Sequence, residues 1–364
     1  MYEQRRQFLN NLVRNNELVG LEIGGLDRPL VVRSELPEGS EILYADHLST
    51  EDLKRKYKAD QTVDIDALVE VDIVCESGDL GDSLGGRLVD YIVASHVVEH
   101  IPNPIRWLQM LFDALRPGGF VFLVVPDKRF TFDFQRPTTT FGEILEAFLS
   151  NKKMPSIRDV FDHYSTGAMI DGSRIWNGVS GSEELVPLAS NKDALKYAYE
   201  VHYDSTYHDV HISIFTPLSF FSIVERMIET QLVMLEVIGF KDTSINDIEF
   251  FVGLKKPQID NEFTKQSCLA SIPSLPLQSL TSPYMPQVKL LSESLKQITD
   301  VHQEFQISYA RLDEERQRQK TQIEAITNEL MLSQQVLNRR SVRLTMNFIH
   351  IVYSIISLFK RKKN

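Results

Sequence analysis

Histidines in two parts of the sequence are its best candidates for acid–base chemistry. His96 and His100 follow an apolar run, and His202, His208 and His211 lie close together further along the chain. Because an imidazole titrates near neutrality, it can take a proton from a hydroxyl group. We expect His100 to be the general base and take His211 as the second candidate.

Other roles for these residues are open. His96 is as well suited to capping the backbone or lining a cofactor. A metal is the rival interpretation for the second group, whose side chains offer several ligand atoms. These side chains are His202, Asp204, His208, Asp209 and His211. Their spacing is neither helical nor typical of zinc, so we expect no metal site.

Three carboxylates each end an apolar run, and two glycines follow the first of them. The acids are Glu22, Asp46 and Asp72, and the glycines are Gly24 and Gly25. Carboxylates in such positions suit a ligand with hydroxyl and amino donors, as an adenosine has: Asp46 would accept from the ribose and Asp72 from the exocyclic amine. The glycines let the backbone approach the ligand closely. Any one of the acids could instead be a structural hydrogen-bond acceptor.

Strand-like and helix-like segments alternate up to about residue 257. The strand-like runs are 18–23, 41–46, 67–72, 90–96 and 120–126. Helices are predicted at 49–57, 104–115 and 217–229, with further strands near 232–237 and 249–254. This alternation predicts an α/β fold whose parallel sheet is covered on both faces, with ligands bound beyond the carboxyl ends of the strands.

The order of these motifs resembles a known family. LEIGG, YAD and VEVD, followed by DYIVASHVVEHIPNPIRWLQMLFDALRPGGFVFLVVPDKRFTFD, are similar to the class I S-adenosylmethionine-dependent methyltransferases. The nearest subgroup is methyltransferase type 11-like and comprises bacterial enzymes encoded with, or fused to, glycosyltransferases of surface polysaccharide synthesis. The stretch YHDVHISIFTP matches the DVH–FTP signature of that subgroup. The resemblance covers about residues 18–257.

The resemblance implies a Rossmann-like, seven-stranded methyltransferase sheet with S-adenosyl-L-methionine as its cofactor. It places Glu22 near the methionine amino group, Gly24 and Gly25 beneath the methionine portion, and Asp46 on the ribose. Asp72 is implied near the adenine, with Asp79 as the alternative, and His96 lines the cofactor. The family prefers E-x-G-x-G-x-G, whereas Leu26 and Arg28 occupy the later glycine positions here, so the loop must take another path.

The resemblance further implies O-methylation of a saccharide in cell-surface glycan biosynthesis. An insertion at about 135–210 is expected to be helical and to cover the acceptor, with Trp176 and the aromatic residues of 196–203 available to stack on sugar rings. A purely structural cap is equally compatible. Lys128 and Arg129 either hold an acidic group of the acceptor or form ion pairs with neighbouring acids. The altered glycine loop also leaves open an inactive scaffold for a glycosyltransferase complex.

The C-terminal third divides into three segments by composition. Residues 258–286 are rich in Ser and Pro and read as a linker after a methyltransferase domain of residues 1–257. Residues 287–338 carry apolar positions in alternating steps of four and three, the pattern of a coiled coil, which predicts a homo-oligomer. A lone helix folded back on the globular domain is the alternative.

The last segment, 339–364, holds seven basic residues and no acidic ones, although the whole chain has a formal net charge of −11. Its uncharged stretch is short for a membrane span, so we expect a helix on the membrane surface or a docking helix for a partner, such as a glycosyltransferase. The acidic remainder argues against nucleic-acid binding. The first twenty residues lack the apolar core of a signal peptide, which predicts a cytoplasmic protein, peripheral on the inner face of the plasma membrane.

Overall fold

The structure of the protein is a computed structural model. It describes residues 2–13, 17–75, 80–170, 172–176, 185–257, 262–275 and 285–361. The chain divides into two compact units, Met1–Tyr284 and Met285–Asn364. The first unit contains the sheet, and the second is one long helix.

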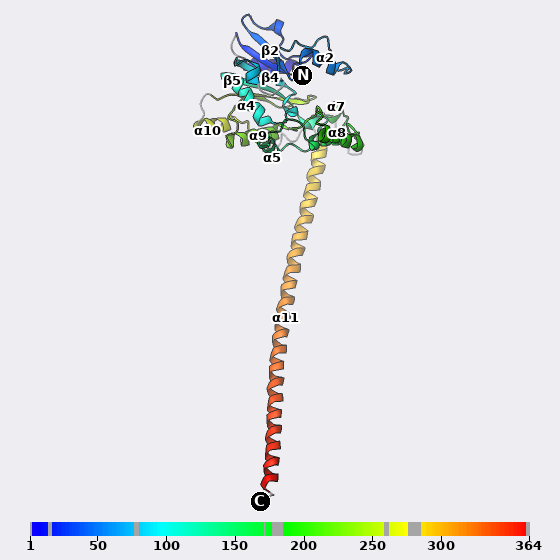
Figure 1. Ribbon diagram of the computed structural model, residues 1–364, viewed down its shortest axis with the longest axis vertical. Coiled ribbons are helices and arrows are strands. Elements are labelled where there is room, and N and C mark those ends of the chain that lie inside the picture. The colour runs from blue at the N-terminus through cyan, green and yellow to red at the C-terminus, as the bar shows by residue number, and fades with distance from the viewer. Residues whose placement is uncertain are drawn as a thin grey trace. The chain divides into compact units, whose positions relative to one another are not determined.

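Within the described residues, seven strands form a single mixed sheet in the order β3-β2-β1-β4-β5-β7-β6 (Figure 1). Strands β1 to β5 run parallel, while β7 lies antiparallel between β5 and β6. Their bounds are β1 Val19–Ile23, β2 Glu41–Asp46, β3 Ile73–Val74, β4 Val89–Ser95, β5 Leu115–Pro126, β6 Glu236–Lys241 and β7 Glu249–Lys255. The predicted seven-stranded α/β fold is confirmed.

Helices cover one face of the sheet, and a helix with a loop covers the other. The first face packs on α3 (Leu80–Ser83), α4 (Pro104–Ala114), α9 (Pro217–Glu229) and α10 (Glu262–Ala270). Figure 1 shows α4, α9 and α10 together on one side of the sheet. The second face packs on α1 (Tyr2–Leu12) and on a loop that includes the 3₁₀ turn η1 (Arg33–Glu35). Helix α2 (Thr50–Tyr57) begins after Ser49, whose side chain accepts the Asp52 N–H as the sequence predicts.

The third strand differs from the prediction. Residues 67–72 were expected to form it, but β3 is Ile73–Val74. The backbone N–H groups of this run are taken by other partners, because Val69 N donates to Leu26 O and Val71 N donates to Thr50 Oγ1. The run therefore packs against the loop after β1 and the start of α2, and backbone hydrogen bonding to β2 begins only at its last residue, Asp72, whose N–H donates to Tyr44 O.

The segment between β5 and α9 is rich in helices, as expected. It contains the 3₁₀ turn η3 (Lys128–Phe130), α5 (Phe141–Leu149), α6 (Ile157–Thr166), α7 (Gly172–Trp176) and α8 (Asn191–Asp204). Short helices of this kind are stabilised at their starts, since Thr140 and Ser156 each form a capping box. Helix α9 begins in the same way at Thr216, followed by Pro217.

Residues that the sequence assigns to a linker contain helix α10. Its Cys268 is fully buried in the main apolar cluster, and Ser271 beyond it accepts a hydrogen bond from Val237 N. The sheet unit therefore continues past residue 257. The Ser- and Pro-rich composition of this segment predicted a linker, because the few apolar residues that anchor helix α10 form no sustained pattern.

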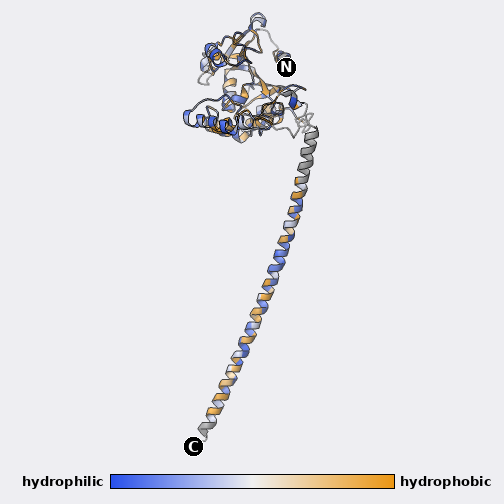
Figure 2. Cartoon of the chain, turned by 90° about the vertical axis from the view of Figure 1, so that its right-hand side faces the viewer, coloured by the Kyte–Doolittle hydropathy of each residue, from blue (hydrophilic) through white to orange (hydrophobic). Residues whose placement is uncertain are grey.

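The second unit consists of helix α11 (Met285–Arg361), which runs through both the predicted coiled coil and the basic tail. Figure 2 shows apolar and polar residues mixed along it. Its predicted seam is exposed: Phe305, Leu312 and Ile323 each present more than half of their surface. The long helix is confirmed, and its coiled-coil pairing stays a prediction. None of the helices in the described part of the chain combines the length and apolar character of a membrane span.

Candidate active site

The loop after β1 departs from the glycine-rich pattern and takes its own path. Gly24 has φ +70° and donates its N–H to Ala45 O of β2, and Leu26 also adopts the left-handed region, at φ +45°. A Cβ added at Gly24 would meet Val97 Cγ2 at 3.3 Å, so glycine fits both the backbone conformation and the space. No helix follows β1 directly among the described residues; the chain continues through Leu30 and Val31 to η1.

Glu22 fixes this loop from beneath. The side chain is buried, and its two carboxylate oxygens accept the N–H groups of Leu30, at 2.6 Å, and Val31, at 2.9 Å. Burial raises the pKa of Glu22 to about 7, although these hydrogen bonds oppose the shift. The contacts of Glu22 hold the loop.

Asp46 lies at the carboxyl end of β2, beside the Gly24 loop. One oxygen, Oδ1, accepts Leu48 N at 3.2 Å and contacts His47 Nδ1 at 2.7 Å. In the described part of the chain no hydrogen bond reaches the other oxygen, Oδ2. Asp46 therefore keeps acceptor capacity at the strand end where a ligand is expected.

Asp72 is the sequence-predicted ligand that the structure places elsewhere. It precedes β3 instead of ending a strand, and its Oδ2 accepts Tyr44 N at 2.8 Å and Arg33 Nη2 at 2.6 Å. The three acids thus have different contacts: Asp72 bonds to the edge of β2, and Glu22 holds the loop. Asp79, the alternative residue, lies outside the described residues.

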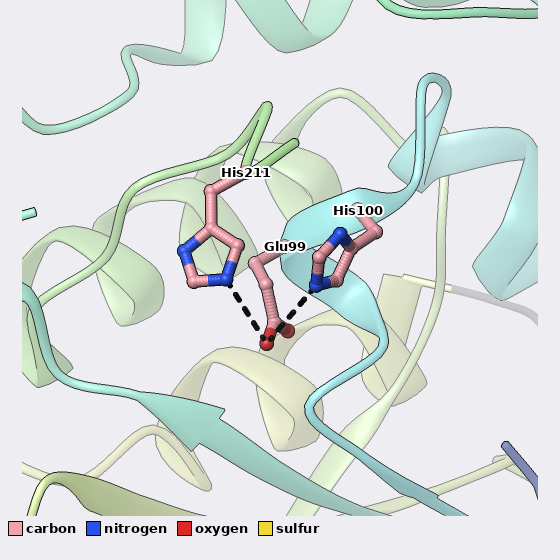
Figure 3. Close-up of side chains that lie close together, drawn as sticks. All are labelled: Glu99, His100 and His211. Carbon is pink, nitrogen blue, oxygen red and sulfur yellow. Dashed lines mark ion pairs between the residues drawn. The ribbon is translucent and has the colours of Figure 1, made fainter. Parts of the chain in front are cut away.

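Three of the histidines converge on the carboxylate of Glu99, which belongs to the 3₁₀ turn η2 (Val98–His100) after β4. The nearest nitrogens are His96 Nδ1 at 3.5 Å, and His100 Nε2 and His211 Nε2 at 3.9 Å, all measured to Glu99 Oε1. Figure 3 shows the rings of His100 and His211 on either side of this carboxylate. The structure therefore unites both predicted base candidates with His96, whereas His202 is exposed on α8.

Backbone hydrogen bonds bring the second histidine group to the first. Glu99 O accepts the N–H groups of Ile212 and Ser213, which fixes the segment after His211 against η2. His163 Nδ1 accepts His211 N at 3.1 Å, and burial, followed by the charges of His211 and Arg136, lowers the pKa of His163 to about 3. A neutral His163 can therefore accept this bond.

A carboxylate contacts the outer nitrogen of each converging imidazole. Glu249 lies 2.6 Å from His96 Nε2, Asp209 lies 2.9 Å from His100 Nδ1, and Asp133 lies 2.5 Å from His211 Nδ1. Burial alone would raise the pKa of Glu249 and Asp133. The histidine and arginine beside each carboxylate have the larger combined effect, so the pKa of each is lowered. The hydrogen bond from His100 lowers the pKa of Asp209 against the effect of burial. All three are charged at neutral pH.

These carboxylates in turn face cations. Arg5 Nη2 lies 2.5 Å from Glu249, Lys56 Nζ lies 3.1 Å from Asp209, and Arg136 Nη1 lies 2.7 Å from Asp133. Burial lowers the pKa of His100, but Asp209 and Glu99 outweigh burial and raise it. The site is thus a layered arrangement of charges in which each imidazole is held by a carboxylate and each of these carboxylates by a cation.

Sequence reasoning missed several of these residues. Glu99 stands inside the HVVEH motif, so its spacing to His96 and His100 was available as a signal. No sequence signal pointed to Arg5, Asp133 or Glu249. Glu249 is 153 residues from His96 in the sequence, and Arg5 is 244 residues from Glu249. Only the antiparallel insertion of β7 beside β5 brings Glu249 to this edge.

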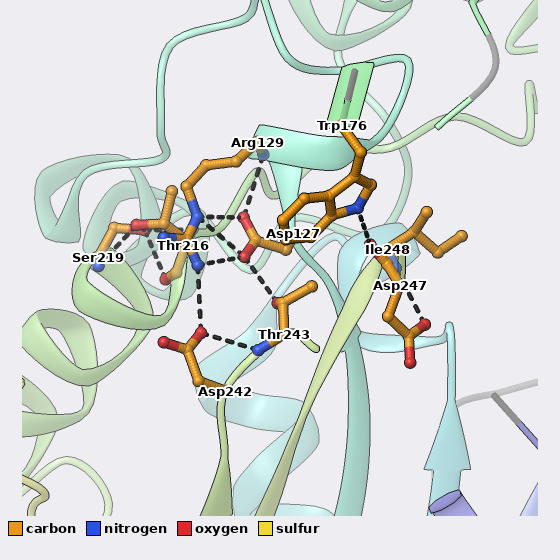
Figure 4. A network of polar contacts seen from close by, with 9 residues as sticks. All are labelled: Asp127, Arg129, Trp176, Thr216, Ser219, Asp242, Thr243, Asp247 and Ile248. Carbon is orange, nitrogen blue, oxygen red and sulfur yellow. Dashed lines mark hydrogen bonds and ion pairs between the residues drawn. The ribbon is translucent and has the colours of Figure 1, made fainter. Parts of the chain in front are cut away.

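Of the two basic residues after β5, Arg129 belongs to a network of polar contacts (Figure 4), while Lys128 Nζ donates to Phe134 O at 2.8 Å. Arg129 pairs with Asp127, at 2.6 Å, and with Asp242, at 3.2 Å. Trp176 stacks on Phe130 with ring centroids 3.8 Å apart and donates Nε1–H to Asp247 O. These contacts match the ion-pair alternative for Arg129 and occupy the indole face expected to stack on a sugar.

Comparison with known proteins assigns the family. The sequence profile of a family described as "Methyltransferase domain" matches residues 37–227, more than half of the chain. The chain therefore belongs to this family. By this family it is a methyltransferase, and its cofactor is S-adenosyl-L-methionine. No curated protein matches the chain by sequence.

Solved structures similar to this chain share little sequence with it. A SAM-dependent methyltransferase from Aquifex aeolicus is 9% identical, with a TM-score of 0.35 over 69% of this chain and 88% of that one. One from Methanosarcina mazei is 14% identical, with a TM-score of 0.30 over 68% and 96%. A putative Zn-dependent alcohol dehydrogenase from Rhodobacter sphaeroides is 13% identical, with a TM-score of 0.39 over 70% and 89%. The family assignment rests on the sequence match.

The residues at the ends of β1 and β2 fit this cofactor. Gly24 leaves room for close approach to the backbone, and Oδ2 of Asp46 is available to ribose hydroxyls. Glu22 serves the cofactor indirectly, by holding the loop that carries Gly24 and Gly25. His96, in the left-handed region at φ +54°, follows β4 next to this loop, since Val97 touches the space over Gly24.

We predict that Glu22→Gln changes how stability depends on pH. The folded-state pKa of about 7 lies above the ordinary 4.5, so unfolding releases a proton between these values, and the wild-type free energy of unfolding falls as pH rises through this window. Glutamine does not titrate. Relative to the variant, the wild type should therefore lose about 3 kcal/mol between pH 4.5 and 7, with no further loss above. Urea unfolding from pH 5 to 8 measures this, with exposed Glu38→Gln as control; a constant difference would contradict it.

We predict that Asp46→Asn weakens cofactor binding whereas Asp72→Asn does not. A charge-assisted hydrogen bond to the ribose contributes about 1.5–3 kcal/mol, so the first variant should bind S-adenosylmethionine roughly 10- to 100-fold more weakly. Asp72→Asn should instead lower thermal stability, because it disturbs the contacts to Tyr44 N and Arg33. Calorimetric titration of both variants measures the difference. Equal weakening would assign Asp72 to the adenine site after all.

Proposed function

We propose that this chain O-methylates a saccharide hydroxyl during bacterial cell-surface glycan synthesis. The observation that carries the proposal is the cluster of carboxylate-backed imidazoles after β4, next to the cofactor loop. Transfer to oxygen requires removal of a proton, and this cluster supplies the groups for it. The saccharide is supported by the resemblance of the 207–217 segment to the glycosyltransferase-associated subgroup.

His100 is the base we propose. Its side chain is 29% exposed, whereas that of His211 is 11% exposed, so His100 is the more accessible to an acceptor. Asp209 holds His100 Nδ1, which leaves Nε2 to take the proton. When bound, S-adenosylmethionine supplies a methyl group whose bond to sulfur breaks, with the electron pair left on sulfur, as the bond to the acceptor oxygen forms. His211, fixed by Asp133, is the second candidate base.

The insertion supplies aromatic surface for the acceptor. Tyr199, Tyr203 and Tyr207 are 52%, 73% and 51% exposed, and Tyr207 is two residues from Asp209, the partner of His100. Such rings can stack on the apolar face of a sugar. Lys56 of α2 also reaches Asp209, so the helix that follows Asp46 contacts the acceptor side of the site.

Helix α11 is proposed to place the enzyme at its substrate. Its exposed seam supports pairing with a second copy, because an unpartnered stripe buries no apolar surface. Near its end, Leu344, Phe348 and Ile355 are also exposed and basic residues flank the stretch, which supports binding to an anionic membrane surface or to a glycosyltransferase. We therefore propose that the protein works on the cytoplasmic face of the membrane.

We predict that His100→Ala abolishes glycan methylation but not cofactor binding. Removing a general base lowers the rate by about 10²- to 10⁴-fold, while S-adenosylmethionine contacts the ends of β1 and β2. Surface glycans from cells lacking the gene should lose a single-methyl mass increment, which the wild type and exposed-site control His202→Ala restore and His100→Ala does not. Unchanged glycan masses in the deletion strain would reject the saccharide; full restoration by His100→Ala would reject the base.

We predict that the coiled-coil seam holds the chain in an oligomer. Replacing Leu312 and Ile326 with Lys places two charges in the seam, and sedimentation should show the mass falling to that of one chain. Gln317→Lys with Asn328→Lys adds the same charge at positions outside the seam and should leave the oligomer intact. A monomeric wild type would contradict the pairing.

A further inference from the structure

The chemistry of Glu99 goes beyond what a methyl-transfer site requires. Its side chain is 1% exposed, and neither carboxylate oxygen accepts a hydrogen bond from any residue that the structure describes. Burying a carboxyl group without a hydrogen-bond partner is destabilising. Among the described residues Glu99 therefore lacks the partner that its burial requires.

The three imidazole nitrogens around Glu99 are not hydrogen-bonded to it. They stand 3.5 to 3.9 Å from Oε1, beyond the usual range for a hydrogen bond of this type. Ligand atoms around a tetrahedral ion with bonds of about 2.0–2.1 Å stand about 3.4 Å apart. The ligand atoms of Glu99, His100 and His211 all lie within 4.8 Å of one another, and Figure 3 shows both rings turned toward the same oxygen.

The outer carboxylates make these inner nitrogens ready to bind a cation. Each imidazole contacts a charged carboxylate at its other nitrogen, which favours the tautomer with the proton on that outer side. The inner nitrogen then presents a lone pair, and three lone pairs facing a carboxylate repel one another. Histidines that bind metals have this arrangement, with the second nitrogen donating to a carboxylate.

The charged side chains around the cluster also favour a bound cation. The outer carboxylates Glu249, Asp209 and Asp133 are compensated on their far sides by Arg5, Lys56 and Arg136, respectively. Glu99 has no such cation among the described residues: its ion pairs are all with the imidazoles. One positive ion at the centre of the cluster would compensate it.

We propose that Glu99, His100 and His211 bind one divalent first-row transition-metal ion. Two imidazole nitrogens and one carboxylate oxygen suit Zn²⁺ and its neighbours and leave a fourth position open, while Mg²⁺ prefers oxygen ligands and bound water. The left-handed backbone of His96, at φ +54°, keeps its ring in the cluster and is a strain typical of functional sites.

The role of the ion in methyl transfer rests on the proposed function, whereas its binding does not. With the ion bound, Nε2 of His100 would be a ligand in place of a base. The ion would lower the pKa of a coordinated acceptor hydroxyl, whose proton would pass to water on the open side of the cluster as the methyl group is transferred. His96 and His100 are 31% and 29% exposed at their side chains, which leaves one side of the cluster open to an acceptor oxygen.

The test uses the full, untagged chain after removal of metals with a chelator. Dialysis against buffered Zn²⁺, followed by elemental analysis, should show one Zn²⁺ per chain and none of comparable affinity for Mg²⁺. Glu99→Gln and His211→Ala should lower Zn²⁺ affinity at least 10-fold. Asp209→Asn, at a half-exposed position, should lower it about 10- to 100-fold by loosening His100. Exposed-site His202→Ala should bind as the wild type does.

Two further measurements keep the outcomes distinct. X-ray absorption on the Zn²⁺-loaded wild type should show two nitrogen ligands, with the remaining ligands oxygen from Glu99 and water. Absence of stoichiometric Zn²⁺, or equal binding by Glu99→Gln and Asp209→Asn, overturns the metal site and leaves an imidazolium as the charge that compensates Glu99. Calorimetry with S-adenosylmethionine on the metal-free chain tests the methyltransferase separately, so either proposal can fail alone.

Discussion

The buried carboxylate of Glu99 is the constraint around which the acceptor half of the site is organised. Removing a carboxyl group from water without hydrogen-bond partners is costly, and three imidazoles surround this one. The imidazoles need carboxylates to orient them, and those carboxylates need cations because they too are buried or half-buried. One group at the end of β4 therefore accounts for three layers of charged side chains.

The backbone of the same residue helps to build the cluster. Glu99 O accepts two N–H groups from the segment after His211, so the residue whose side chain faces that imidazole also fixes its position. Arg136 Nη2 then donates to His211 O while its Nη1 holds Asp133. Both side-chain and backbone contacts therefore act on the short segment around His211. The position of His211 depends on η2 and on the segment that carries Asp133 and Arg136.

Sequence patterns predicted the parts of the fold whose signals are local. The apolar runs of β1, β2, β4 and β5 and the caps at Ser49 and Thr216 each lie within a few residues. The third strand failed because side-chain and loop partners took the N–H groups of Val69 and Val71. The site was half predictable for the same reason: the histidines stand in short motifs, whereas Glu249 and Arg5 reach them only through the order of strands.

The two halves of the site therefore depend on contacts of different range. Gly24 and Asp46 sit at the ends of neighbouring strands, and Glu22 fixes the loop between them with residues eight and nine positions away. The acceptor half combines η2, the insertion and the start of β7. These segments meet through backbone hydrogen bonds as well as side chains, since Glu99 O accepts the N–H groups of Ile212 and Ser213. The cofactor loop is held by its own contacts, so it can lack the later glycines, with Leu26 in the left-handed region, and still present Gly24 beside Asp46.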